Sequence, residues 1–303
     1  MFDVIVVGAG PAGLTSAIYL RRAAKSVLLL EKGAFGGQIT YSPLVENYPG
    51  FSSVSGNDLA EHMVDQALAL GADVEVENVT EVCRENGMMR VKCEEGAEFE
   101  SKAVIFALGA KHRRLGLAGE EKFIGEGISF CAVCDGAFYQ DKTVALIGGG
   151  NSALQEAILL SETCRKVIVV QNLDFLTGEA RLQEILRARD NVEILTGFVV
   201  DAIDAGDTFQ GITIRQTAGG ETRHLALDGM FVAIGLEPEN EAFGAFAPLD
   251  QAGYFDVSED CKTPTEGIFV AGDCRKKGVR QVTTATADGA AAAIAACRYL
   301  DSL

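Results

Sequence analysis

Apolar and polar segments alternate along this chain of 303 residues, and one arrangement of them occurs twice. In each copy an apolar strand precedes a glycine cluster and a helix rich in Ala and Leu, at residues 4–20 and again at 143–160. A further apolar strand follows at 26–30 and at 166–170, the spacing of a βαβ unit. These strands lack polar alternation, as in parallel sheets covered on both faces. The sequence therefore predicts an α/β protein with two Rossmann-like three-layer domains.

The segments between and after the two copies predict how the domains are connected. Residues 73–82 and 89–99 alternate like strands and predict a small antiparallel insertion ahead of the apolar stretch 103–110. Apolar strands at 229–234 and 267–273 indicate that the chain returns to complete the first domain. We therefore expect a discontinuous first domain at 1–113 and 243–303, with the second domain, 114–242, inserted into it through short hinges.

Composition and charge narrow the class of protein. Hydrophobic residues make up 48% of the chain, and the formal net charge is −17, which favours solubility and disfavours nucleic acid or an anionic membrane as a partner. The first residues form an apolar strand without a basic leader, and the Ala-rich stretch 289–297 is too short to span a bilayer. We expect a cytoplasmic protein in which 289–297 is a buried helix. The basic segment 275–280 is expected to be a solvated loop, with a docking patch for an acidic protein as the alternative.

The first glycine cluster has the GxGxxG pattern in the context where that pattern is informative, after a strand and at the start of a helix. In Gly8-Ala9-Gly10-Pro11-Ala12-Gly13 the first glycine permits a tight turn, the second lets a pyrophosphate approach, and the third lets helix pack on strand. The helix N-terminus favours the phosphate charge. Glu31, at the end of the next strand, is placed to bind an adenosine ribose. An ordinary glycine turn is the alternative interpretation.

The second glycine cluster keeps the same pattern with one accepted variation. Gly148 and Gly150 take the fingerprint positions with Ala153 as the last, and Asn151 and Ser152 between them complete the possible NAD(P)H turn. The segment after the next strand, 171–174, has no Lys or Arg to neutralise a 2′-phosphate. A preference for NADPH is therefore not supported, and a vestigial fold that binds no nucleotide is the alternative.

Cysteine spacing identifies the candidate reaction centre. Of eight cysteines, only Cys131 and Cys134 lie close together in sequence. In a CxxC pair one thiolate attacks an external disulfide and the other resolves the mixed disulfide, and the adjacent Asp135 is a candidate proton donor and acceptor. The alternatives are half of a zinc site or two core cysteines. The chain has three histidines and no second CxxC, so a complete zinc ligand set is not evident.

A second candidate carboxylate follows a late apolar strand. Asp273, after Gly272, lies at a strand end where it could hold a ribityl hydroxyl or another polyol. A helix N-cap is the alternative role.

Taken together, these residues resemble the low-molecular-weight thioredoxin reductases over essentially the whole chain. The resemblance rests on specific motifs: the first glycine cluster, Gly36-Gly37-Gln38-Ile39, Glu46-Asn47-Tyr48-Pro49-Gly50, Cys131-Ala132-Val133-Cys134-Asp135, and Gly272-Asp273 followed by Arg280-Gln281-Val282.

The resemblance implies an FAD-dependent thioredoxin-disulfide reductase. Cys134 would lie against the flavin and Cys131 would attack thioredoxin, while the inserted domain swings between two orientations and the protein is a homodimer. It also implies that FAD is held by the first and last thirds of the chain, at Gly8, Gly10, Pro11, Ala12, Gly13, Glu31, Gly37, Gln38, Asn47, Ala110, Asp273, Arg280, Gln281 and Val282.

The chain departs from the family pattern where NADPH would bind. The family's His-Arg-Arg segment and a further Arg, which hold the 2′-phosphate, correspond here to Gln171-Asn172-Leu173 and Thr177. Some relatives with such losses resemble NADH-dependent enzymes, and others take electrons from ferredoxin without a pyridine nucleotide. Because the turn at 148–153 is intact, we expect NADH as the donor, with ferredoxin as the alternative.

Two other functions fit the same motifs. A flavin-dependent dithiol oxidase would carry electrons from a small dithiol through the cysteine pair and flavin to oxygen. A flavin- or nucleotide-sensing protein would bind without turnover, since GxGxxG motifs alone establish only binding. The CxxC pair disfavours the sensing protein.

Overall fold

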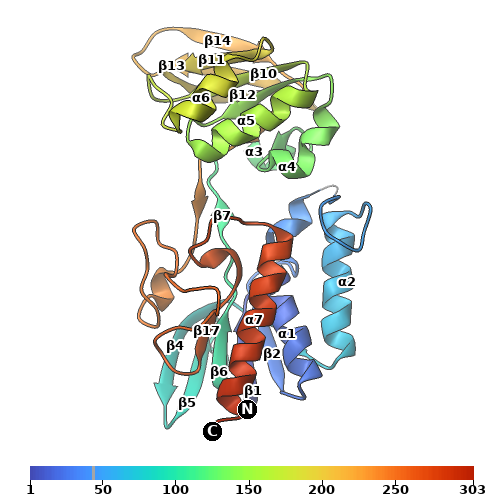
Figure 1. The fold of residues 1–303 in the computed structure, drawn as a ribbon, viewed down its shortest axis with the longest axis vertical. Helices are drawn as coiled ribbons and strands as arrows, with labels where there is room; N and C mark the ends of the chain where they lie inside the picture. The colour runs from blue at the N-terminus through green and yellow to red at the C-terminus, as the bar shows by residue number, and fades with distance from the viewer. Residues whose placement is uncertain (43–44) are drawn as a thin grey trace. The chain divides into compact units, whose positions relative to one another are not determined.

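The computed structural model describes residues 1–42 and 45–303, which form two compact units. The first unit comprises Met1–Tyr41, Val45–Lys111 and Glu237–Leu303, and the body of the second is His112–Leu236. Each unit contains a sheet with a parallel core of strands and with helices packed on it (Figure 1). The expected fold class, two Rossmann-like α/β domains with the second inserted into the first, is confirmed.

The sheet of the first unit is seven-stranded, with parallel strands in the order β3-β2-β1-β6 and with β17 also paired to β6. Strands β4 and β5 continue from β6 as an antiparallel meander. The strands are β1 (Phe2–Val7), β2 (Val27–Glu31), β3 (Asp73–Val76), β4 (Val79–Glu85), β5 (Met88–Cys93), β6 (Glu98–Phe106) and β17 (Ile268–Val270). The expected antiparallel insertion therefore holds for β4 to β6 but is wrong for residues 73–76. These residues pair parallel to β2, because the helix between the two strands makes a βαβ crossover.

The strands of this sheet are apolar on both faces because each face has its own cover. Val4 and Val6 pack into a core with the helices, whereas Ile5 and Val7 pack into a core with the meander and the loop around Phe255. The covering helices are α1 (Pro11–Arg22), α2 (Gly56–Ala69) and α7 (Val282–Leu300). Because both faces of the sheet are packed, the strand ends and the turns that follow them have fixed positions.

Helices α1 and α7 lie side by side (Figure 1) and approach closely through small residues. A Cβ on Gly289 would lie 2.2 Å from the Ala12 carbonyl oxygen, and Ser16 Oγ donates a hydrogen bond of 3.0 Å to the Gly289 carbonyl. The Ala-rich stretch 289–297 lies within α7, and several of its alanines are fully buried. Among the residues described, no helix is both long and apolar enough to cross a bilayer.

The second unit contains a five-stranded parallel sheet in the order β11-β10-β9-β15-β8. One face packs against α5 and the segment that carries the CxxC pair, and the other packs against a three-stranded antiparallel sheet, β12-β13-β14. Its elements are α3 (Glu120–Phe123), β8 (Ile128–Ser129), α4 (Ala132–Asp135), η2 (Gly136–Tyr139), β9 (Thr143–Ile147), α5 (Asn151–Thr163), β10 (Lys166–Gln171), α6 (Ala180–Arg187), β11 (Val192–Thr196), β12 (Phe198–Ala205), β13 (Phe209–Gln216), β14 (Thr222–Ala226) and β15 (Gly229–Val232).

The two segments that connect the units pair with each other as β7 (Lys111–His112) and β16 (Leu236–Glu237). The second connection lies at Leu236, earlier than the expected position near 243. The reason is that Phe243 stacks on Phe106 in the core of the first unit, with ring centroids 4.6 Å apart. The remaining short elements of the first unit are η1 (Gly37–Tyr41), η3 (Glu241–Phe243) and η4 (Gly272–Cys274).

Candidate functional site

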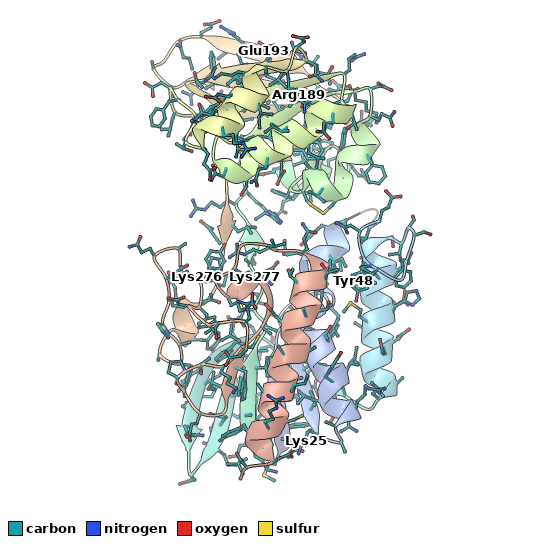
Figure 2. The ribbon with its side chains drawn as sticks, viewed as in Figure 1. Lys25, Tyr48, Arg189, Glu193, Lys276 and Lys277 are labelled. Carbon is teal, nitrogen blue, oxygen red and sulfur yellow. A yellow bond between two sulfur atoms is a disulfide. The ribbon has the colours of Figure 1, made fainter. Side chains whose placement is uncertain are left out.

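Cys131 and Cys134 are joined in a disulfide at the start of the short helix α4 (Figure 2). Both residues are partly exposed, and Val133 between them is 56% exposed. The backbone N–H of Cys134 donates to Cys131 Sγ at 3.2 Å. Once the pair is reduced, this donor would stabilise a thiolate at Cys131 in preference to Cys134.

Asp135 places a buried carboxyl directly after the disulfide. Its Oδ2 accepts a hydrogen bond of 2.6 Å from Ser129 Oγ, and its Oδ1 accepts none from the described residues. Burial raises the pKa of Asp135, against a lowering by the Ser129 hydrogen bond. A carboxyl of this kind can hold a proton close to the sulfur pair.

Glu156 is a second carboxyl at this site, and no local sequence motif identifies it. It lies on α5, and its Oε2 accepts a hydrogen bond of 3.3 Å from the backbone N–H of Ala132, the residue after Cys131. Burial raises the pKa of Glu156 to about 7. The cysteine turn is therefore in contact with the same helix that begins at the second glycine turn.

The first glycine turn lies between β1 and α1 in the first unit. A Cβ on Gly13 would lie 1.8 Å from the Gly8 carbonyl oxygen, so the turn closes tightly only with glycine there. A Cβ on Gly10 would meet nothing nearer than the Gly36 carbonyl oxygen at 4.0 Å, and no side chain caps the N-terminus of α1. The turn therefore leaves free first-turn N–H groups, as an anion-binding helix N-terminus requires.

Glu31 is tied to this turn by both carboxylate oxygens. Oε2 accepts a hydrogen bond of 2.8 Å from Ala9 N–H, and Oε1 accepts one of 2.9 Å from Gly33 N–H. The side chain thus lies at the end of β2 beside the glycine turn, the place expected for a ribose ligand.

The structure brings the other expected flavin residues of the first unit to the same turn. Gly37 lies against Gly10, where a Cβ would be 3.3 Å from the Gly10 Cα. Gln38 follows in η1, and Pro11 and Ala12 open α1. Ala110, which is buried, follows β6 at the strand end that adjoins Gly8.

The late part of the chain completes this cluster. A Cβ on Gly272 would lie 2.8 Å from the Ala12 Cβ, which places Asp273 next to the start of α1. Arg280 Nε donates to the Asp273 carbonyl at 3.4 Å. Gln281, the N-cap of α7 ahead of Val282, accepts a hydrogen bond of 3.4 Å from Asn47 Nδ2.

The basic segment 275–280 is not the solvated loop that the sequence suggested. The side chains of Arg275 and Lys277 are 9% and 7% exposed. Arg275 binds both carboxylate oxygens of Asp288 on α7, from Nε at 2.9 Å and Nη2 at 2.8 Å. Lys276 is exposed, at 56%, and pairs with Asp256. The expectation failed because a buried acidic partner on α7 draws two of the cations inward.

The second glycine turn is held by its own chain. A Cβ on Gly149 would lie 2.6 Å from Cδ of Gln171, whose side chain is buried. The backbone N–H groups of Thr177 and Gly178 both donate to the Gly149 carbonyl at 2.9 Å. The segment after β10 therefore folds back onto the turn.

The residues that follow this turn keep the features of a dinucleotide helix. Gly150 is the N-cap of α5 without a side-chain cap, Ser152 is exposed and Ala153 is buried. Asn151 and Glu179 bind each other, through Asn151 Nδ2 to Glu179 Oε1 at 3.1 Å and Glu179 N–H to Asn151 Oδ1 at 2.7 Å. Residues 171–179 contain no Lys or Arg.

Comparison with known proteins relates this arrangement to a family. Residues 2–289 match the model described as pyridine nucleotide-disulphide oxidoreductase. The thioredoxin reductases of Bacillus subtilis and Treponema pallidum are each 38% identical to this chain over 100% of its length, and the matches cover 96% and 98% of those proteins. The chain belongs to the pyridine nucleotide-disulphide oxidoreductases. The solved thioredoxin reductase of Streptococcus pyogenes, 36% identical, has a TM-score of 0.92 and covers 100% of this chain and 99% of that one.

Within the pyridine nucleotide-disulphide oxidoreductases, the resemblance to low-molecular-weight thioredoxin reductases is confirmed by these full-length matches. The expectation of an oxidoreductase enzyme is confirmed with it. No group of three or more His, Cys, Asp or Glu side chains that could hold a metal ion occurs within residues 1–42 and 45–303.

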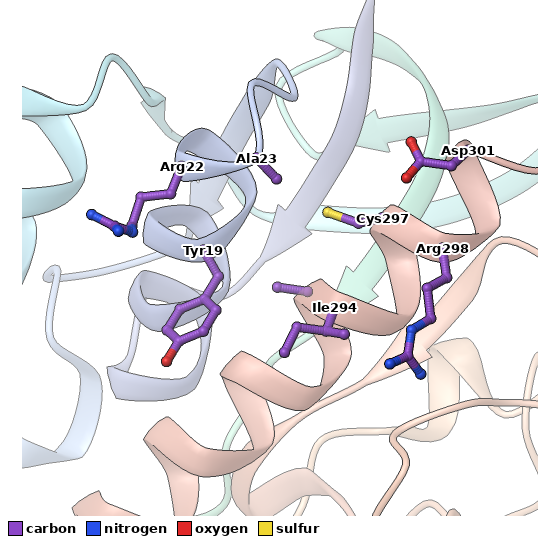
Figure 3. Close-up of a pocket in the computed structure, with 8 residues that line it drawn as sticks. Tyr19, Arg22, Ala23, Ile294, Cys297, Arg298 and Asp301 are labelled. Atoms are coloured by element: carbon purple, nitrogen blue, oxygen red, sulfur yellow. The ribbon is translucent and has the colours of Figure 1, made fainter.

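One pocket of this oxidoreductase lies away from the glycine turn, between the C-terminal ends of α1 and α7 (Figure 3). Tyr19 and Arg22 line it from α1, and Ile294 and Cys297 line it from α7. Because the glycine turn is at the opposite end of α1, this pocket is separate from the candidate flavin residues.

Proposed function

We propose that this chain is an FAD-dependent thioredoxin-disulfide reductase. The observation that carries the proposal is the partly exposed Cys131–Cys134 disulfide with the buried carboxyl of Asp135 beside it. Once it is reduced, an accessible cysteine pair can exchange with a disulfide of another protein, and a carboxyl with a raised pKa can hold the proton that the exchange moves. The similarity to thioredoxin reductases supports thioredoxin as the protein substrate.

The residues of the first unit fit FAD. The uncapped start of α1 suits a pyrophosphate, Glu31 suits a ribose, and Asp273 suits the polyol chain. The Asp273 side chain is 31% exposed while its Oδ1 lies 3.1 Å from Lys277 Nζ, so part of the carboxylate remains open to a ligand. We assign the same role to the neighbouring residues Gly37, Gln38, Asn47, Ala110, Arg280, Gln281 and Val282. Bound FAD would supply the electron pair that reduces the disulfide.

The chain's own residues perform the exchange. Two electrons and two protons convert the Cys131–Cys134 disulfide to a dithiol. Cys131, as the thiolate favoured by the Cys134 N–H, attacks the thioredoxin disulfide, so that one sulfur–sulfur bond forms and one breaks. Cys134 then attacks the mixed disulfide, which re-forms the Cys131–Cys134 bond and releases reduced thioredoxin. Asp135 takes the proton from the attacking thiol and returns one to the leaving thiolate.

We propose NADH as the electron donor. The turn at 148–153 retains an uncapped helix start for a pyrophosphate, which NADH and NADPH share. The segment 171–179 offers no cation for the 2′-phosphate that only NADPH carries. A nucleotide without that phosphate therefore suits the turn better.

One observation favours ferredoxin as an alternative donor. The amides of Thr177 and Gly178 close the segment after β10 onto Gly149, and the Gln171 side chain fills the space beneath it. If this packing leaves no room for an adenosine ribose, the second unit serves only as the carrier of the cysteine pair.

The experiment that separates these donors is anaerobic reduction of the purified flavoprotein, followed by the flavin absorbance. NADH, NADPH and reduced ferredoxin are added separately. Rapid bleaching by NADH supports the nucleotide donor. Bleaching by ferredoxin alone supports the alternative, and a protein that holds no flavin contradicts the proposed function.

A further inference from the structure

A buried ionic cluster lies beside the proposed polyol ligand, and it consists of Asp273, Arg275, Lys277 and Asp288. Lys277 Nζ lies 3.1 Å from Asp273 Oδ1 and 3.1 Å from Asp288 Oδ2. Arg275 holds both oxygens of Asp288, and Asp288 Oδ2 also accepts the Gly272 N–H at 3.1 Å. The cluster contains two cations and two anions, so its charges balance.

Lys277 differs from its neighbour Lys276 in where its ammonium lies. The Lys277 side chain is 7% exposed, and that of Lys276 is 56% exposed; Figure 2 labels both residues. Burial of an ammonium is unfavourable unless the ammonium is paired, and Lys277 contacts two carboxylates. Because Arg275 already binds both oxygens of Asp288, Lys277 is the cation in direct contact with Asp273 that can balance its charge.

The Asp273 carboxylate has two different sides. Oδ1 is fully buried and faces Lys277, yet the side chain as a whole is 31% exposed. The exposed area therefore belongs to the rest of the side chain, and Oδ2 is the oxygen left for a ligand. Lys277 Nζ lies 3.1 Å from Oδ1, so the ammonium both pairs with the carboxylate charge and fixes this oxygen in place.

The charged groups around Asp273 act in opposite directions on its proton affinity. Burial raises the pKa of Asp273, Lys277 and Arg280 lower it, and Asp288 raises it. Helix α1, which contacts this segment near Gly272, has no charged residue in its first turn. Lys277 is the cation closest to the carboxylate.

We propose that Lys277 is a positioning residue for flavin binding, which holds the Asp273 carboxylate charged and anchored at Oδ1 so that Oδ2 accepts a hydrogen bond from a flavin polyol hydroxyl. This inference rests on the proposed binding of FAD to the first unit. It adds a role for Lys277, which makes no contact with the flavin itself in this scheme.

The test measures FAD affinity of the full-length apoprotein by flavin fluorescence. Lys277→Met is expected to weaken FAD binding by about 10- to 100-fold, since a charge-assisted contact is lost. Lys277→Arg restores the charge and is expected to recover most of the affinity. Lys276→Met is the matched control and should bind FAD like the wild type. Lys277→Gln, which keeps donors to both carboxylates without the charge, covers the case in which Lys277→Met does not fold.

The pH dependence distinguishes positioning from a general loss of structure. Without the Lys277 charge the pKa of Asp273 rises further, so FAD affinity of Lys277→Met or Lys277→Gln should fall as the pH is lowered from about 8 to about 6. Wild-type affinity should change little over the same range. In an Asp273→Asn background, Lys277→Met should change the affinity by less than about twofold, because the group it acts on is gone.

These measurements distinguish a failure of the proposed function from a failure of the role assigned to Lys277. If the wild-type apoprotein does not bind FAD, the proposed function fails. If the wild type binds FAD and the folded Lys277 variants bind it equally well at every pH, the role of Lys277 is overturned while the proposed function stands.

Discussion

The Gln171 side chain packs directly beneath Gly149, whereas Glu31, in the equivalent position of the first repeat, accepts a hydrogen bond from Ala9. Gly8 N–H donates to the Leu30 carbonyl at 2.7 Å, and Gly148 N–H donates to the Val170 carbonyl at 2.9 Å. Glu31 and Gln171 directly follow these two strand residues, so their positions are equivalent. The first turn thus has a carboxylate beside it, and the second has a neutral amide. The neutral Gln171 supplies no cation for a 2′-phosphate, and this is the basis for NADH as the proposed donor.

Cations introduced after β10 should change the donor preference. Asn172 and Leu173 are exposed, and Asn172→Arg with Leu173→Arg supplies two guanidinium groups. We expect the ratio of kcat/KM for NADPH to that for NADH to rise by about 10- to 100-fold, because Arg binds phosphate through charge-assisted hydrogen bonds. Gln155→Arg with Gln210→Arg adds the same charge at other exposed positions and should leave the ratio unchanged. An unchanged ratio in the first variant would contradict a nucleotide site at this turn.

Gly10→Ala should separate flavin binding from folding. Gly10 has φ −76° and ψ −176°, which alanine adopts without strain, and its Cβ would have room in the protein. We expect an unfolding midpoint close to that of the wild-type apoprotein but FAD affinity reduced at least about tenfold, because the Cβ lies where the pyrophosphate approaches. Gly206→Ala in the second unit, with 3.6 Å from its Cβ to the nearest atom outside its chain neighbours, is the control and should keep FAD. Equal affinity in both variants would argue against a pyrophosphate at Gly10.

Proton transfer at Asp135 can be tested through Ser129. Asp135→Asn should slow thioredoxin reduction by about 100-fold, since the group that moves the proton is lost. Ser129→Ala removes the hydrogen bond that lowers the pKa of Asp135. The limb of the pH–rate profile that reports Asp135 should therefore move to higher pH. A profile that is unchanged in Ser129→Ala would mean that another group moves the proton.

Glu156 should make stability depend on pH. Burial raises its pKa from the ordinary 4.5 to about 7, so over that interval the folded protein binds a proton that the unfolded chain releases. The contribution of Glu156 to folding stability is therefore fully present below the pKa that Glu156 has in the unfolded chain. It is lost as the pH rises through the higher pKa that Glu156 has in the folded protein.

The measurement is urea unfolding of Glu156→Gln and the wild type at about pH 5 and about pH 8. The variant should gain stability relative to the wild type at the higher pH, by up to about 2 kcal/mol. Glu162→Gln, at an exposed position of the same helix, should show no such change with pH. A Glu156→Gln difference that is equal at both pH values would rule out the buried titration.

Much of the fold could be predicted because the two glycine clusters each follow an apolar strand. That local pattern identifies β1–α1–β2 and β9–α5–β10 without knowledge of long-range contacts. The parallel pairing of β3 could not be read from its sequence, because alternation in a short edge strand does not say which neighbour it joins. The second connection was misplaced for a similar reason, since only the packing of Phe243 on Phe106 shows which core the segment joins.

The candidate site was predictable where chemistry depends on local spacing, as in Cys131, Cys134 and Asp135. It was not predictable where a distant element supplies the partner. Glu156 reaches the cysteine turn from α5, and Asp288 reaches Arg275 from α7. A run of Lys and Arg residues predicts a solvated loop, because these residues are almost never fully buried unless they are paired. The buried acidic partner cannot be identified from the run itself.

In the proposed reaction, electrons leave this protein through Cys131. The most direct measurement is anaerobic: the flavin is reduced, oxidised thioredoxin is added, and the new thiols on thioredoxin are counted. We predict two thiols per electron pair with the wild type, and with Cys131→Ser a protein that keeps its flavin but forms no free thioredoxin thiols. Reduction of thioredoxin by Cys131→Ser at the wild-type rate would show that electrons reach thioredoxin by another route.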